Sequence, residues 1–176
     1  TSAPLDSLRR FHAWAPGAFA FTQLRCEFQG MLMNTGLRAE SWTPGAAARD
    51  GTLPWDGRGA LTWSPRLGVV FPVSVREAIS FAYVRLHQAP DRDLLYDDRT
   101  AVSNRRPLGN PDLKPATVIS YEAALKHLFD HGWSMQASIF YRDLFGQPGV
   151  RDFSIPQGPL DLRYENADEG HAQGVE

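Results

Sequence analysis

The segment Met31–Trp42, with the sequence MLMNTGLRAESW, alternates apolar and polar residues. Met33 and Leu37 occupy alternate positions, whereas Asn34 and Arg38 occupy positions between the apolar ones. Because successive side chains of a β-strand point to opposite faces, this order predicts a strand with one apolar and one polar face. A tilted strand of about ten residues is also long enough to cross a lipid bilayer.

The same alternation recurs in about seven segments of the chain. The expected strands are about Ala18–Phe28, Met31–Trp42, Leu61–Phe71, Ala78–His87, Thr117–Leu128, Trp133–Asp143 and one that begins near Leu162. Tight turns alternate with long connections rich in Gly, Pro and Asp, at about residues 43–60, 88–114 and 144–161. A membrane barrel keeps its short turns at one rim and its long loops at the other. The order therefore predicts an all-β fold, an antiparallel transmembrane β-barrel fragment of about seven up-and-down strands.

One segment of this pattern also fits a helix. In YEAALKHLFDH, Tyr121, Leu125 and Phe129 lie at helical spacing, and several residues are strong helix formers. The segment alternates equally well as a strand, and a helix there would break the pairing of its neighbours. We therefore expect a strand at Thr117–Leu128.

The composition excludes several other classes of protein. The 176 residues carry a net charge of −2, which offers no polycationic surface for nucleic acid. No apolar run approaches the roughly 18 residues of a transmembrane helix. The single cysteine, Cys26, cannot form a disulfide within the chain and is expected to be a small apolar side chain. The chain lacks an initiator methionine, and we expect it to be an internal part of a longer protein.

No residue pattern predicts catalysis, a metal or a cofactor. The motifs GxSxG, HExxH, CxxC and GxxxxGK[ST] are absent. His127 and His131 are four residues apart, as in a helical zinc site, but they straddle a turn if the segment is a strand. The glycine and terminal glutamate of an EF-hand are missing around the acidic residues Asp91, Asp93, Asp97 and Asp98.

Several aromatic residues fall at or near the ends of the expected strands. Examples are Trp42, Trp63, Trp133 and Tyr141. Membrane barrels place aromatic rings at both lipid–water interfaces, where an apolar ring with a polar edge is stable. The distribution therefore favours a barrel over a sandwich with ordinary core aromatics.

The block Asn110–Gly146, NPDLKPATVISYEAALKHLFDHGWSMQASIFYRDLFG, resembles the barrel of TonB-dependent outer-membrane receptors, which carry N-P-x-L-K-P-E, S-Y-E and F-Y-x-D segments. Ser64–Val73 and Ser80–Asp91 are similar to the S-P-R-L-G and Y-G-x-x-x-Q-x-P segments of that family. Tyr164–Glu176 is similar to its Y-x-N-A-x-x-G-x-x-x-G-x-E segment. The matching residues, which the resemblance implies are structural, are Arg66, Gly68, Tyr83, Pro90, Asn110, Pro111, Leu113, Lys114, Pro115, Tyr121, Glu122, Tyr141, Asp143, Asn166, Gly174 and Glu176.

The resemblance extends from about Ala18 onward, and it departs from the family pattern at three positions. Glu40 stands where the family has Asp, Ala116 where it has Glu, and Val84 where it has Gly. The blocks look most like the receptors that carry an N-terminal carboxypeptidase-regulatory-like domain. A complete barrel has about 22 strands around a plug. Residues 1–176 are therefore expected to be a partial barrel domain, with the plug, the TonB box and both barrel ends absent.

The resemblance implies a multi-pass barrel in the outer membrane of a Gram-negative bacterium, working in active uptake of a scarce ligand. The implied partners are outer-membrane lipid, lipopolysaccharide and the TonB complex, the last through an N-terminal region of the parent protein. Siderophore, cobalamin, glycan and peptide ligands stay open, because selectivity lies in loops and plug. A passive porin-like barrel and a soluble β-rich binding module are the alternatives.

The long loops are the expected place for ligand contacts. Within them, the candidate ligand-contact residues are Trp55, Tyr96, Arg105 and Phe153. Another set of charged residues is expected to face the plug or the water of the lumen. This inward set is Arg38, Glu40, Arg66, Glu122, Lys126 and Arg142.

Overall fold

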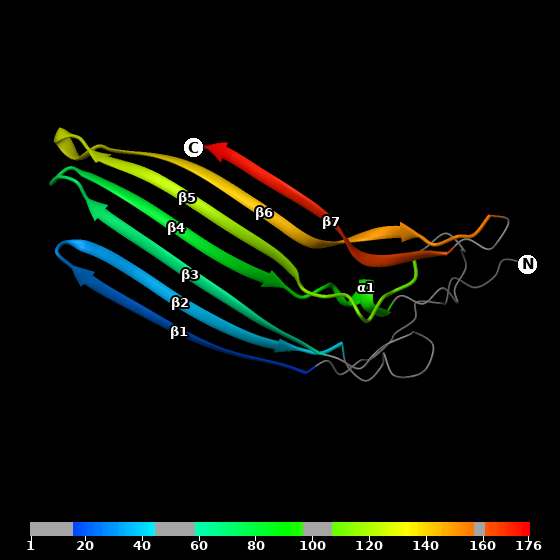
Figure 1. The fold of residues 1–176 in the computed structure, drawn as a ribbon. Coiled ribbons are helices and arrows are strands. Elements are labelled where there is room, and N and C mark those ends of the chain that lie inside the picture. Colours follow the sequence, from blue (N-terminus) through cyan, green and yellow to red (C-terminus); the bar gives the residue numbers. More distant parts are fainter. Residues whose placement is uncertain (1–15, 45–58, 97–106, 157–160) are drawn as a thin grey trace, which may run out of the picture.

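The chain forms one antiparallel sheet in a computed structural model, which describes residues 16–44, 59–96, 107–156 and 161–176 (Figure 1). Seven strands lie side by side in sequence order. The elements are β1 (Gly17–Phe28), β2 (Met31–Trp42), β3 (Ala60–Pro72), β4 (Glu77–Gln88), α1 (Arg92–Tyr96), β5 (Ala116–Leu128), η2 (Asp130–Gly132), β6 (Ser134–Asp152) and β7 (Leu162–Val175). The predicted all-β, up-and-down fold is confirmed. No helix among the described residues is long and apolar enough to span a bilayer.

The segment that also fits a helix is a strand, β5. It pairs along its length with β4 on one side and with β6 on the other. These two ladders satisfy the backbone groups on both edges of the strand, and this tertiary pairing outweighs the local helix propensity. His127 Nδ1 lies 3.2 Å from Glu77 Oε1, whereas His131 occupies the turn η2 with a φ of 73°.

The third long connection begins later than predicted. A loop was expected from Leu144 onward because Gly146 and Pro148 follow, but β6 continues to Asp152 and pairs with β7. Register shifts fall on both sides of Gln147, and Gly146 adopts a φ of 61°. A β-bulge tolerates glycine and proline within a strand. These residues therefore mark a bulge, beyond which β6 and β7 bend together (Figure 1).

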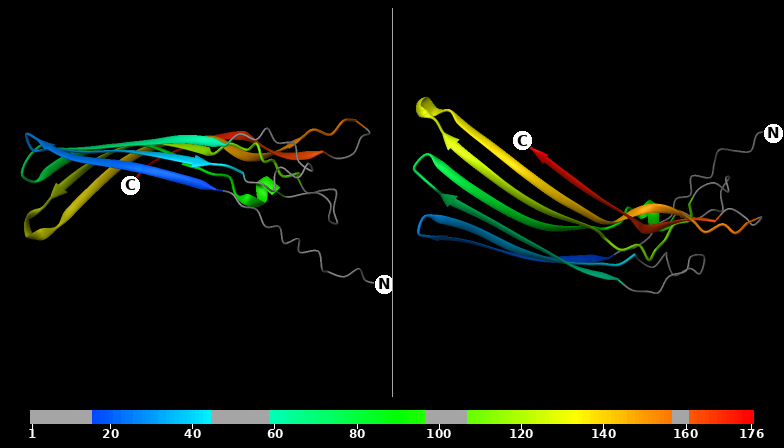
Figure 2. Two further views of the ribbon diagram at one scale, coloured as in Figure 1. Left: turned by 90° about the horizontal axis from the view of Figure 1, so that it is seen from below. Right: turned by 45° about the horizontal axis from the view of Figure 1, so that its top comes forward.

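The sheet is a single twisted layer with both faces open, as Figure 2 shows. Tight turns lie at one end, the turn end, and the longer connections lie at the other, the loop end. Large apolar side chains such as Phe81, Trp133 and Ile139 are exposed in the described part of the chain. Within the described residues, the sheet therefore has two edge strands with unpaired backbone groups and a face of bare apolar side chains.

Candidate functional site

The cross-strand register divides the side chains between two faces, because directly opposed residues of antiparallel strands share a face. On the polar face, one row crosses all seven strands: Gln23, Gly36, Arg66, Val84, Ser120, Arg142 and Ala172. The inward set named above shares this face throughout: Arg38, Glu40, Arg66, Glu122, Lys126 and Arg142. The opposite, apolar face carries Leu67, Phe81, Tyr121 and Ile139.

Arg66 lies across Gly36 on the polar face. A Cβ at Gly36 would stand 2.6 Å from Arg66 Nε and 3.3 Å from the Thr22 carbonyl oxygen. The absence of a side chain at Gly36 lets Arg66 Nη2 donate a 2.6 Å hydrogen bond to Gln23 Oε1 on β1. The guanidinium of Arg66 therefore holds a fixed position over three strands.

Replacing Gly36 by valine should displace Arg66 and lower the free energy of unfolding of the protein by about 1–3 kcal/mol, the usual cost of overpacking. Urea unfolding measures this change. Gly68→Val is the matched control, since the nearest atom to its new Cβ would be 4.0 Å away. Equal destabilisation by the two changes would contradict the proposed contact between Gly36 and Arg66.

A hollow of about 270 Å³ opens beside these residues, toward the loop end. We call it the arginine hollow, and its lining includes Phe21, Arg38, Ser64, Arg66 and Leu86. Arginine side chains offer planar donor groups that match carboxylate and phosphate oxygens in pairs. The arginine hollow therefore has the chemistry to hold an anionic group.

Arg38 and Arg66 differ in how much of their charge is available. Arg38 Nη2 lies 3.0 Å from Glu40 Oε2, and the guanidinium carbon of Arg38 lies 4.2 Å from the centre of the Phe19 ring. Among the described residues, Arg66 is bound by the Gln23 amide, which is neutral and leaves the positive charge of Arg66 uncompensated. Arg66 is therefore the stronger anion-binding group of the two.

At the loop end, the N-P-x-L-K-P block forms a compact turn. Asn110 Oδ1 accepts a 2.9 Å hydrogen bond from the Asp112 amide, and Asn110 Nδ2 donates a 2.8 Å bond to the Tyr164 carbonyl. The Asn110 amide donates to the Leu94 carbonyl at 2.8 Å, and Pro111 is fully buried. An asparagine that binds the backbone two residues ahead stabilises a turn, and Asn110 also ties that turn to β7.

Asn166 joins the same block to the bulge of β6. Its Oδ1 accepts from the Lys114 amide at 2.7 Å, and its Nδ2 donates to the Lys114 carbonyl at 2.8 Å. The same Nδ2 donates to the Gly146 carbonyl at 2.7 Å. One amide side chain thus holds three segments that are far apart in the sequence.

Asn166→Leu keeps the size of the side chain but removes all three hydrogen bonds. We expect local destabilisation of the loop end by about 1–3 kcal/mol, because backbone groups of Lys114 and Gly146 lose their partner. Hydrogen exchange at the Lys114 amide should accelerate accordingly. Asn34→Leu, in the middle of β2, is the control and should leave that amide unchanged. Unaltered exchange in the Asn166 variant would refute the bridging role.

A small hydrophobic cluster fastens the loop end. Leu95 of α1 and Leu113 of the turn block are only 1% and 2% exposed, and they pack with Leu94, Trp42 and Tyr164. The cluster therefore joins β2, α1, the turn block and β7. Among the described residues, this cluster is the part of the protein that most resembles a conventional hydrophobic core.

The structure describes two of the four candidate ligand-contact residues. Tyr96 ends α1 at the loop end, and Phe153 follows β6 with 42% of its surface exposed. Trp55 and Arg105 lie outside the described residues. The structure thus places two of the four at the loop end, and their role in binding stays a prediction.

Phe153 lies beside charged residues that the sequence reasoning did not select. The guanidinium carbon of Arg163 lies 5.5 Å from the Phe153 ring centre, and its Nη2 lies 2.7 Å from Asp161 Oδ2. The hydrogen bond to Asp161 raises the pKa of Arg163, and the Ser154 hydroxyl lowers the pKa of Asp152. Sequence spacing gave no indication of this group, because it forms across the end of the β6–β7 hairpin.

Three of the remaining family-motif residues are buried, closely packed or bound through their backbone groups. Pro90 is buried, and a Cβ at Gly174 would stand 2.7 Å from the Phe140 ring. Glu176 exchanges two backbone hydrogen bonds of 2.9 Å with Ser138. Within the described residues, no group of three His, Cys, Asp or Glu side chains could hold a metal ion.

Comparison with known proteins agrees with this architecture. The family model described as TonB dependent receptor-like, beta-barrel, matches residues 4–176. The chain therefore belongs to the TonB-dependent receptor β-barrel family. No curated protein matches the sequence.

Two solved receptors share the fold. One is a double mutant of the Serratia marcescens hemophore receptor HasR, in complex with its hemophore HasA and heme, with a TM-score of 0.66 and 17% identity. The other is a mutant of the Pseudomonas aeruginosa ferric enterobactin receptor PfeA with enterobactin, with a TM-score of 0.57 and 12% identity. Each covers 92% of this chain, which spans 31% and 32% of those chains. At such identities the likeness concerns the fold alone.

Proposed function

We propose that this chain is part of the wall of an outer-membrane receptor that imports a scarce ligand by energy-coupled transport in a Gram-negative bacterium. The family match over residues 4–176 carries the proposal. The up-and-down sheet, with one apolar face and tight turns all at one end, supports placement across a bilayer. Import makes and breaks no bond, so the proposal needs no catalytic residue and no cofactor.

The two faces have different partners in this proposal. The apolar face meets outer-membrane lipid and lipopolysaccharide, whereas the polar face, with the row through Arg66 and Arg142, meets the plug or the water of the lumen. The TonB complex acts through an N-terminal region of the parent protein. Coupling to TonB is a property of the family as a whole, and it is proposed here on family membership.

The ligand is proposed to bind among the long connections at the loop end, with Trp55, Tyr96, Arg105 and Phe153 as candidate contacts. Siderophores, cobalamin, glycans and peptides are the ligand classes considered. The two structural neighbours were solved with heme and with enterobactin, and the arginine hollow around Arg66 supports a ligand that carries negative charge.

An uptake experiment separates this function from passive diffusion. A strain lacking the full-length receptor is supplied with ferric enterobactin or hemin as its sole iron source, with and without a plasmid copy. We expect restored growth on at least one of them, which loss of TonB abolishes, and short-term uptake of that iron source, which a proton uncoupler stops. A porin would instead give uptake that survives the uncoupler and stepwise channels in planar bilayers. Uptake that survives the uncoupler, or stepwise channels in planar bilayers, would overturn the proposal.

A further inference from the structure

The apolar face carries a row of three tyrosines across neighbouring strands. Tyr83 of β4 is opposite Tyr121 of β5, which is opposite Tyr141 of β6. The Tyr83 and Tyr121 rings are 5.4 Å apart between centres. Three aromatic rings at one level of a sheet form a short section of an interfacial belt.

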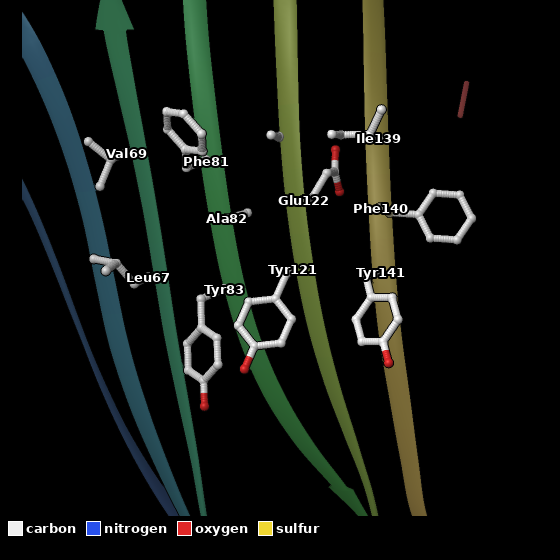
Figure 3. Close-up of a pocket in the computed structure, with 11 residues that line it drawn as sticks. Leu67, Val69, Phe81, Ala82, Tyr83, Tyr121, Glu122, Ile139, Phe140 and Tyr141 are labelled. Atoms are coloured by element: carbon white, nitrogen blue, oxygen red, sulfur yellow. The ribbon is translucent and has the colours of Figure 1, made fainter. Parts of the chain in front are cut away.

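The three rings point the same way, with their hydroxyl groups turned from Phe81 and Ile139 (Figure 3). Strand β3 runs from the loop end to the turn end, so Leu67 lies nearer the loop end than Val69. In Figure 3 the tyrosine hydroxyls point in the direction that leads from Val69 to Leu67, and they therefore face the loop end. This is the orientation of tyrosines that keep their rings in hydrocarbon and their hydroxyls in water.

Two polar residues lie one row closer to the loop end. Arg85 follows Tyr83 by two positions in β4, and Asp143 follows Tyr141 by two positions in β6, so each shares the face of its tyrosine. The apolar face thus carries two charged residues, on either side of Ile119, one row beyond the tyrosines.

Below the tyrosines, toward the turn end, the apolar face is hollowed rather than flat. Ala123 lies directly between Phe81 and Ile139 in the register, so a methyl group separates two large side chains. A hollow of about 400 Å³ covers the tyrosine row and Ala123, and one of about 300 Å³ continues over Ala123 and Ala137. The two hollows share Phe81, Ala123 and Ile139, and together they form a track that we call the alanine groove.

The alanine groove runs along the strands over five residues of β6, from Tyr141 to Ala137, which are separated by four steps. A strand rises about 3.3 Å per residue, which makes the track roughly 13 Å long. One leaflet is half of a hydrocarbon core of about 30 Å, or roughly 15 Å. Barrel strands are tilted by about 35–45°, so the track covers roughly 10 Å of depth, about two-thirds of one leaflet. It begins at the level where the tyrosine hydroxyls mark the interface.

We propose that the alanine groove binds one saturated acyl chain of lipid A, whose phosphate-bearing head lies beside Arg85 and the hydroxyls of Tyr83 and Tyr121. Arg85 supplies the positive charge that an anionic head group requires. The proposal rests on the proposed function, because only placement in the outer membrane puts lipid A against this face. It adds a defined lipid site on the wall, which transport itself does not require.

The test uses the full-length receptor, purified from outer membranes in mild detergent, stripped of lipid and incubated with hexa-acylated lipid A. Native mass spectrometry then counts the lipid that each receptor retains. We expect one tightly held lipid A on the natural receptor, and at least a fivefold loss in Ala123→Trp, which fills the groove. Ala20→Trp, on the apolar face of β1 away from the groove, is the matched control and should retain the lipid.

Each other outcome is decisive. Equal retention by the Ala123 and Ala20 variants, or none by the natural receptor, overturns the groove. Stronger retention of dipalmitoyl phosphatidylethanolamine overturns the assignment to lipid A. Heat-dependent migration on gels verifies that the variants assemble, and Ala123→Leu replaces the tryptophan variant if that one fails. A receptor that does not reach the outer membrane at all would count against the proposed function, whereas an assembled one without bound lipid counts only against the groove.

Discussion

Ala137→Arg in the full-length receptor is expected to lower the free energy of unfolding by about 2–4 kcal/mol, as for a cationic side chain near the bilayer midplane of a barrel. Ala137 is on the apolar face, four residues from Tyr141 and four from Trp133. The guanidinium would therefore enter hydrocarbon midway between two aromatic levels, where water cannot solvate it. Urea unfolding of the receptor in lipid vesicles, followed by tryptophan fluorescence, measures the change.

The control makes the same substitution on the other face. Ala82 lies opposite Glu122 in the register, on the polar face with the charged row. Ala82→Arg places its new charge beside a carboxylate, and we expect a change below about 1 kcal/mol. If both variants lost the same stability, or if Ala137→Arg were harmless, the assignment of the two faces would be wrong.

Leu113→Ala is expected to destabilise the loop end by about 2–5 kcal/mol, the cost of emptying a site that the remaining structure cannot fill. Leu113 is 2% exposed and packs with Leu95, which is 1% exposed. Removal of this contact leaves α1 joined to the turn block mainly by the hydrogen bond from the Asn110 amide to the Leu94 carbonyl. The amides of Leu108 and Tyr164, which bond across to the carbonyls of Leu162 and Leu108, should then exchange faster with solvent.

Binding should weaken in the same variant, because the connections that are proposed to contact the ligand lose their anchor. Leu86→Ala, at a position 55% exposed near the end of β4, is the control and should leave exchange at Leu108 and Tyr164 unaltered. Protection that persists at both amides in Leu113→Ala would show that hydrogen bonds alone hold the loop end together.

The strand positions could be read from the sequence because they depend on local properties. Alternation of apolar and polar residues identified β1 to β5 within one or two residues, and tight turns such as Gln29-Gly30 separated them. Gln29 and Gly30 both adopt a positive φ. Glycine adopts such a conformation without strain, whereas the extended residues of a strand have a negative φ. Periodicity also placed Arg38, Arg66, Glu122 and Arg142 on one face.

The bulge in β6 could not be read in the same way. Gly146 and Pro148 are strand breakers in any local reading, and the strand continues through them because the Asn166 side chain binds the Gly146 carbonyl from the next strand. That bond joins residues 20 positions apart. Local propensity carries no information about a partner at such a distance.

The resemblance identified the loop-end motif but not how it works. Asn110 and Asn166 were recognised as family positions, and the structure shows that their amides bind backbone groups of segments more than 50 residues away in sequence. The alanine groove is a similar case. Ala123 and Ala137 looked like ordinary small residues of a strand, and they form a track only because Phe81 and Ile139 flank them in the register.

By itself, the sequence determined the class of fold, the order of the strands, the faces on which charged and apolar residues lie, and membership of the receptor family. These features depend on the period of a strand, the chemistry of turns and short motifs, all of which are local. The tertiary structure alone decided the extent of β6, the anchoring of the loop end and the hollows on both faces. These depend on cross-strand register, which brings together side chains that no local pattern connects.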